Sequence, residues 1–236
     1  MSQSTPAGRQ DLPPLTQPDA SRAARAFRAR GWWAIPIPAQ KKGPCLAKWQ
    51  DTRIGVDDIK LYFRTDSNIG LILGEPSGGL VDVDLDCPEA LLLAPALLPP
   101  TGMIHGRPSA LRSHYWYVAS SAPEGTVRHE APDGSTIVEL RSTGGQTVVP
   151  PSVHPSGERL GWAAAGEPAQ VDVAHLDRAV RLIAAGVLLL RAWRVAPPVD
   201  QARLIGATRE AMLQGGWQET EIADLVEAVE ALGGAL

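Results

Sequence analysis

The chain has 236 residues, of which 44% are hydrophobic and 20% are charged, and this composition is typical of an ordinary globular protein. Its formal net charge of -4 excludes the overall basic balance of proteins that coat nucleic acid, so any nucleic-acid partner needs a local basic groove. The two cysteines, Cys45 and Cys87, cannot form a four-ligand zinc site by themselves and do not suggest a disulfide framework.

The N-terminal segment, residues 1–18, is polar and rich in proline, and we expect it to be a disordered leader. It lacks the apolar core of a secretory signal. The longest apolar run, residues 182–190, is too short to cross a bilayer. Together with the few cysteines, these features predict a cytoplasmic protein that has no membrane partner.

From Asp19 onward the pattern predicts helices and strands in alternation. The first helix begins where Asp19 or Ser21 caps its free N–H groups, and it ends at Gly31. A second, short helix is expected over residues 56–63, and a third begins at Pro88. The expected strands are 32–39, 69–73, 79–86, one centred on residue 114, and two around the Gly-Gly turn at 144–145.

From about residue 171 the sequence is helical, with helices expected over 173–193, 200–216 and 219–232. The order of elements therefore predicts a mixed α/β (α+β) part followed by an all-helical part.

The segment Asp82-Val83-Asp84-Leu85-Asp86 carries the strongest chemical signal. Because side chains alternate between the faces of a strand, the three aspartates share one face. Three carboxylates on one face repel each other, and Mg²⁺ or Mn²⁺ would supply the compensating charge. The alternative is a solvent-exposed strand edge whose aspartates resist aggregation.

Two later strands also place polar side chains on one face. Arg112, His114 and Trp116 alternate together, so His114 either contacts a phosphate beside Arg112 or packs among aromatic residues. Glu139 and Arg141 share a face of the next strand. Glu139 either completes a carboxylate triad or forms an ordinary cross-strand ion pair.

A proline-rich loop follows these strands. Pro150 and Pro151 stop regular strand pairing, so Ser152 and His154 project from a rigid loop, for which a purely structural turn is the alternative. Basic side chains that could line a nucleic-acid groove are Arg22, Arg25, Arg28, Arg30, Lys41, Lys42 and Arg107. For the arginines, the alternative is the polar face of an amphipathic surface helix.

Several common catalytic motifs are missing from the sequence. It contains no GxxxxGK[ST] segment, which excludes a P-loop ATPase within this chain, and no HExxH or cysteine/histidine zinc array. GxSxG is also absent, so no nucleophile elbow supports a serine hydrolase.

Taken in order, the segments NIGLILG, GGLVDVDLD, RSHYWY and VELRSTGGQTVVPPSVHPSGERLGW resemble the bifunctional primase-polymerase (prim-pol) domain of the archaeo-eukaryotic primase superfamily. That domain is common in replication proteins of phages and plasmids. The resemblance runs from about Gly31 to Trp162. It depends on the order of an acidic strand, a strand with a histidine and a later acidic strand, and on the PPSxHxSG loop.

Carried over by position, the resemblance implies catalytic metal ligands at Asp84, Asp86 and Glu139. Asp82 stands where the family usually has an aliphatic residue, but it also forms an Asp-x-Asp pair with Asp84, so it is a further candidate ligand. The implied nucleotide-binding residues are Arg112, Ser113, His114 and Arg141, with His114 also catalytic. The implied nucleic-acid contacts are Lys41, Lys42, Lys48, Arg107, Ser152 and His154.

The fold implied is an archaeo-eukaryotic primase-like catalytic domain over residues 19–165, with a central mixed sheet, followed by a helical subdomain over residues 171–236. The activity implied is metal-dependent nucleotidyl transfer to a 3′-hydroxyl on a DNA template, in phage-type or plasmid-type replication. Implied partners are template and primer DNA, dNTP or NTP substrates, and a replicative helicase in cis or in trans. The alternatives are a metal-dependent nuclease that uses the same carboxylates, and a non-catalytic module that binds nucleic acid or a replication partner.

Overall fold

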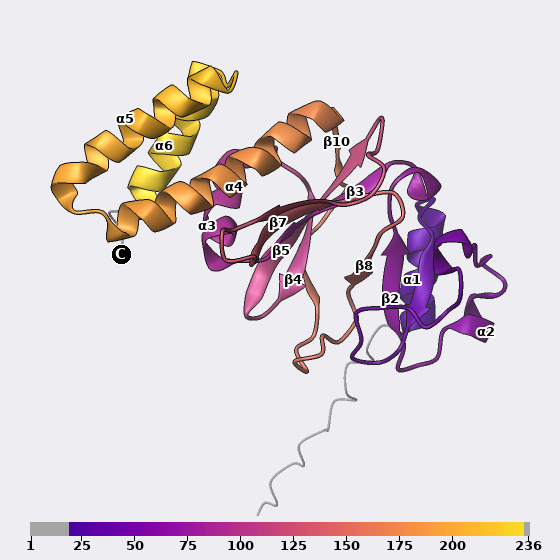
Figure 1. Ribbon diagram of the computed structural model, residues 1–236. Coiled ribbons are helices and arrows are strands. Elements are labelled where there is room, and N and C mark those ends of the chain that lie inside the picture. The colour runs from indigo at the N-terminus through magenta and orange to yellow at the C-terminus, as the bar shows by residue number, and fades with distance from the viewer. Residues whose placement is uncertain (1–18, 234–236) are drawn as a thin grey trace, which may run out of the picture.

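The computed structural model describes residues 19–233 as a mixed α+β fold with two β-sheets (Figure 1). The predicted leader, residues 1–18, lies outside the described residues. The helices are α1 (Ala20–Ala29), α2 (Ile59–Tyr62), α3 (Pro88–Leu97), α4 (Val173–Val195), α5 (Pro198–Gln214) and α6 (Glu219–Gly233). The strands are β1 (Ala34–Ile37), β2 (Asn68–Ile72), β3 (Leu80–Leu85), β4 (Met103–Arg107), β5 (Ala110–Ala119), β6 (Val127–Glu130), β7 (Thr136–Arg141), β8 (Gln146–Val149), β9 (Gly161–Ala165) and β10 (Ala169–Val171).

The larger sheet has seven strands in the order β6-β7-β3-β5-β4-β9, with β10 added beside β5. Its neighbours pair antiparallel except for β10, which runs parallel to β5. The central mixed sheet predicted from the sequence is therefore confirmed. Strands β1, β2 and β8 form a separate, smaller antiparallel sheet.

One face of the larger sheet carries the main hydrophobic core. Val81, Val83 and Leu85 of β3 point to this face and pack against α3 and α4. The helix α6 packs in turn on α3 and α4, and α4 runs along the sheet while α5 and α6 lie beyond it (Figure 1). The first of the C-terminal helices thus shares a core with the sheet. Among the described helices, none combines the length and hydropathy needed to cross a membrane.

Local sequence explains where the first helix begins and ends. The Asp19 side chain accepts a hydrogen bond from the backbone N–H of Ser21 (3.1 Å), as expected for an N-cap. Gly31 follows the helix with φ +85°, a conformation that favours glycine. The second helix is shorter than the predicted 56–63, because residues 55–58 form a turn that the Asp58 N–H closes onto the Gly55 carbonyl (3.1 Å).

The chain crosses between the two sheets after β2, after β7 and after β8, and the first two crossings are bonded to each other. The Leu73 N–H donates to the Gly145 carbonyl (3.0 Å), and the Glu75 N–H donates to the Thr143 hydroxyl (3.3 Å). Gly74 has φ +76°, and a β-carbon at this position would run into the backbone of Thr143. This close crossing brings β8 next to the polar face of the larger sheet.

Replacing Leu93 with Ala should lower the free energy of unfolding by about 2–5 kcal/mol, because it leaves a cavity in the core. Leu93 is fully buried, and its methyl groups lie against Gly186 of α4. The neighbouring Leu92 is 48% exposed, so Leu92→Ala is the matched control and should change stability by no more than about 0.5 kcal/mol. Urea denaturation of both variants measures the difference, and equal losses would contradict this packing of α3.

Candidate functional site

The register of the larger sheet places polar side chains from five strands in one row. Asp84 of β3 lies directly opposite His114 of β5 on one side and Glu139 of β7 on the other. His114 lies opposite His105 of β4, and Glu139 lies opposite Arg128 of β6. Because β3 turns its valines and leucines toward the helices, this row lies on the opposite face of the sheet.

Three carboxylates converge at the centre of this row. Asp84, Asp86 and Glu139 each offer an oxygen, and these oxygens all lie within 4.8 Å of one another. Asp84 and Glu139 are buried, whereas Asp86 follows the end of β3 and is exposed. Three hard oxygen donors at this spacing fit a divalent cation of the Mg²⁺ type. The group could therefore hold a metal ion.

Two arginines neutralise the buried carboxylates. Arg141 Nη2 lies 2.6 Å from an Asp84 oxygen, and Arg141 Nε donates to Glu139 (2.7 Å). Arg128 Nε donates to the other oxygen of Glu139. Burial disfavours a charged Glu139, but Arg141 and Arg128 lower its pKa. Burial also opposes the charge of Arg141, yet Asp84, Asp82 and Glu139 raise its pKa, so the guanidinium stays charged.

Asp86 remains the least compensated of the three carboxylates. Partial burial and the nearby negative charge of Asp84 raise the pKa of Asp86 to about 6. At neutral pH the group therefore holds a negative charge that its surroundings disfavour. A bound cation would relieve this repulsion.

His114 is bound on one edge and stacked on one face. Its Nδ1 lies 3.0 Å from an Asp82 oxygen and 3.4 Å from an Asp84 oxygen. Burial disfavours the protonated ring, but the charges of Asp84 and Asp82 raise the pKa of His114. The ring stacks on His105, with centroids 4.3 Å apart and an angle of 9° between the planes.

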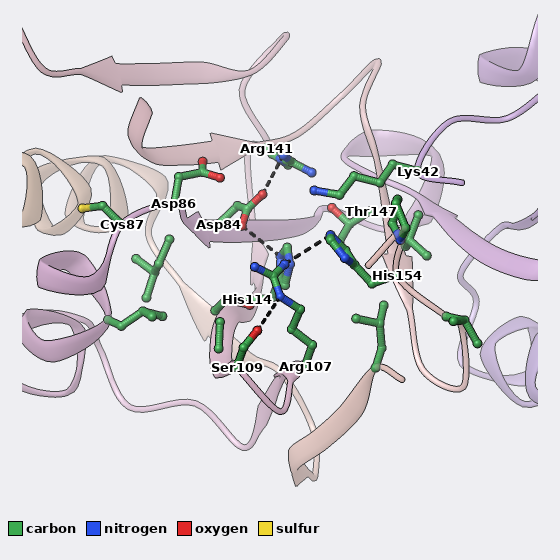
Figure 2. Close-up of a pocket in the computed structure, with 18 of the residues that line it drawn as sticks. Lys42, Asp84, Asp86, Cys87, Arg107, Ser109, His114, Arg141, Thr147 and His154 are labelled. Atoms are coloured by element: carbon green, nitrogen blue, oxygen red, sulfur yellow. Dashed lines mark hydrogen bonds and ion pairs between the residues drawn. The ribbon is translucent and has the colours of Figure 1, made fainter. Parts of the chain in front are cut away.

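These side chains line one part of a cavity of about 360 Å³, which is within the usual range for small-molecule sites (Figure 2). Its rim is basic, with Lys41 and Lys42 from the loop after β1, Arg107 from β4 and His154 from the loop after β8. Arg107 Nη1 lies 3.2 Å from His154 Nε2. Carboxylates at one end and cations at the rim suit a ligand that carries both phosphates and a bound cation.

The structure brings most of the predicted site residues to this cavity. The predicted residues that line it are Asp84, Asp86, Ser113, His114, Arg141, Lys41, Lys42, Arg107 and His154. Glu139 contributes to the carboxylate group beside it.

Four predicted residues lie elsewhere, for different physical reasons. Asp82 is fully buried beneath the cavity and is not one of the three grouped carboxylates. Arg112 is exposed and bonds the hydroxyl of Tyr115 (3.3 Å) instead of facing the cavity. Ser152 is buried, and its hydroxyl accepts a hydrogen bond from the backbone N–H of Ile69 in β2 (2.9 Å). Lys48 is an exposed residue before a short 3₁₀ turn.

The predicted arginines of α1, and Arg30 directly after it, do not line the cavity either. Arg28 stacks over Trp33 and Arg30 stacks over Trp32, with guanidinium carbons 3.4 Å and 4.1 Å from the ring centroids. This arrangement matches the alternative of an amphipathic surface helix with cation–π contacts.

Three residues of the site were not predicted from the sequence: His105, Thr147 and Arg128. His105 and Arg128 belong to β4 and β6, short strands whose sequences MIHGR and VRHE carry little apolar alternation. Thr147 lies in the predicted strand after the Gly-Gly turn, but it belongs to the other sheet, so its contact with Asp82 is visible only in three dimensions.

The family model described as bifunctional DNA primase/polymerase, N-terminal (Prim-Pol), matches residues 23–176. The matched segment contains every strand of both sheets and all the residues that line the cavity. No curated protein matches the sequence.

Replacing Asp86 with Asn should stabilise the metal-free protein at pH 8 by about 1 kcal/mol, a value reduced for the solvent around this side chain. The reason is that the change removes a negative charge that both partial burial and the neighbouring Asp84 disfavour. In the unfolded chain an aspartate titrates near pH 4, whereas Asp86 titrates at about 6 in the folded protein. Wild type therefore loses stability as the pH rises between these values, and the advantage of the variant should appear over the same interval.

Thermal unfolding at several pH values between 4 and 8 measures this difference. Asp57→Asn, in the exposed turn before α2, is the matched control and should show no such trend. Added Mn²⁺ should stabilise wild type more than Asp86→Asn. A variant less stable than wild type at pH 8 would contradict the repulsion inferred here.

Proposed function

The chain belongs to the family of bifunctional DNA primase/polymerase N-terminal domains, and we propose that it is a metal-dependent nucleotidyltransferase that extends a 3′-hydroxyl on a DNA template. In this proposal it acts as a DNA primase/polymerase on dNTP or NTP substrates, in replication of the phage or plasmid type. A replicative helicase in cis or in trans would expose its template. The observation that carries the proposal is the convergence of Asp84, Asp86 and Glu139 beside a cavity with a basic rim.

The three carboxylates would hold Mg²⁺ or Mn²⁺, because both are hard cations that prefer oxygen ligands. When bound, such ions supply charge neutralisation at the triphosphate and activation of the attacking hydroxyl. Asp84 and Glu139 come from adjacent strands, so their separation is set by the sheet and not by a loop.

The cationic side chains would bind and orient the triphosphate. Arg141 and His114 lie next to Asp84, and Lys42 and Arg107 lie farther out on the rim (Figure 2). Fixed positive groups around a transferring phosphoryl group stabilise the charge that develops in the transition state. Lys41 and His154, also on the rim, are the positions we assign to phosphates of the nucleotide or of the primer end.

The double variant Asp84→Ala/Asp86→Ala should lose nucleotide incorporation by at least about 10³-fold, because it removes two of three proposed metal ligands. Primer extension and unprimed synthesis, each with dNTPs and with NTPs in Mg²⁺ or Mn²⁺, measure this loss. The matched control is Asp57→Ala/Asp58→Ala, which removes the same charge from an exposed turn. Circular dichroism confirms that both variants keep the fold, and full activity in the first variant would refute the proposal.

Two further measurements distinguish the proposed polymerase from a nuclease and from a non-catalytic binding module. Incubation of wild type with labelled DNA and Mn²⁺ but no nucleotides should leave the DNA intact, and degradation would assign the same carboxylates to a nuclease. Calorimetry with a nucleoside triphosphate should show binding that depends on Mn²⁺. Absence of such binding would indicate a non-catalytic module.

A further inference from the structure

Asp82 lies on the same strand face as the metal-site carboxylates, but its surroundings are different. It is fully buried, and its Oδ2 accepts a hydrogen bond from the Thr147 hydroxyl (2.7 Å) and lies 3.0 Å from His114 Nδ1. Its Oδ1 is buried and has no hydrogen-bond partner among the described residues. A buried carboxylate with one unbonded oxygen costs folding free energy, so its presence calls for a functional explanation.

His105 supports His114 from the other side. Its Nδ1 accepts the indole N–H of Trp116 (2.8 Å), so the hydrogen of the neutral ring is on Nε2 and points to the Val148 carbonyl (3.1 Å). Burial and the charge of His114 lower the pKa of His105 far below its ordinary value, so the ring is neutral. Both nitrogens are engaged, and the orientation of the ring is therefore fixed.

These contacts leave one atom of His114 free for a ligand. Its Nδ1 faces carboxylate oxygens, which only accept hydrogen bonds, so Nδ1 carries a hydrogen. One ring face is stacked on His105. His114 lines the cavity, and its Nε2 bonds no group in residues 19–233.

We propose that Asp82, Thr147 and His105 are positioning residues that hold His114 with Nδ1 toward Asp82 and with Nε2 available to a phosphate group in the cavity. Thr147 and Val148 are adjacent residues of β8 and bond Asp82 and His105 respectively. The smaller sheet therefore fixes the two residues that contact His114 in the larger sheet. Asp82 then has no part in metal binding. The identity of the ligand as a nucleoside triphosphate rests on the proposed function, whereas the positioning of His114 does not.

The full-length protein labelled with ¹⁵N-histidine tests the positioning without any activity measurement. Wild type should show a His114 Nδ1–H signal that exchanges slowly with water, because the group is buried against Asp82. In Asp82→Val this signal should be lost to exchange. Persistence of the protected signal in that variant would overturn the proposal.

Binding measurements on the same proteins separate positioning from metal ligation. Asp82→Val should weaken binding of a non-hydrolysable nucleoside triphosphate about tenfold, as expected for a misplaced charge-assisted hydrogen bond. Its affinity for Mn²⁺ alone should stay within about twofold of wild type, whereas Asp84→Asn should lose Mn²⁺. Loss of Mn²⁺ binding in Asp82→Val would make Asp82 a ligand and overturn the assignment.

A milder pair of variants covers the case in which Asp82→Val does not fold. Thr147→Val removes only the hydroxyl that fixes Asp82 and should weaken triphosphate binding about threefold, and Thr147→Ser, which keeps the hydroxyl, should restore it. Equal affinities in the two variants would contradict the role of Thr147. If wild type incorporates no nucleotide while the signals and affinities behave as stated, the polymerase activity fails and the positioning of His114 stands.

Discussion

The antiparallel register of β3 with β5 and β7 is the constraint from which the site follows. Residues directly opposite in such pairs have β-carbons about 5 Å apart, so pairing Asp84 with His114 and with Glu139 brings the three groups together without help from loops. A slip of one residue would turn Glu139 toward the helices and Leu140 toward the cavity. The apolar core that forbids this slip therefore also fixes the geometry of the carboxylates.

The same register creates an electrostatic cost that the surrounding residues offset. Asp84 and Glu139 form a like-charge pair across adjacent strands, which is normally destabilising. Arg141 contacts both carboxylates, and Arg128 contacts Glu139 from the edge of the sheet. Asp86 at the strand end has no ion pair of this kind within residues 19–233 and is the one whose pKa rises. The unbalanced charge is thus concentrated at the open end of the group, where a cation can enter from the cavity.

The sequence predicted the polar face of β3 well because the alternation of apolar and acidic residues there is regular. It could not distinguish the environments of the aspartates, since Asp82 is covered by a strand of another sheet through a contact between residues 65 positions apart. The burial of Ser152 could not be predicted from its own loop either, because it depends on a contact with β2. The strand β9 consists mainly of small residues and β10 has only three residues, so neither shows the β-branched alternation that identifies a strand.

The cavity lies where the two sheets meet, and both sheets contribute to its charge. The larger sheet carries the carboxylates together with Arg107 and Arg141, whereas the lysines come from a loop that the smaller sheet holds in place. The Asn68 amide of β2 donates to the Lys41 carbonyl (3.1 Å) and also bonds both backbone groups of Val153, next to His154. Gln146 of β8 donates to the Lys42 carbonyl (2.7 Å). Thr147 and Val148 of β8 also bond Asp82 and His105 of the larger sheet, so this one strand links the lysine loop to the residues behind His114.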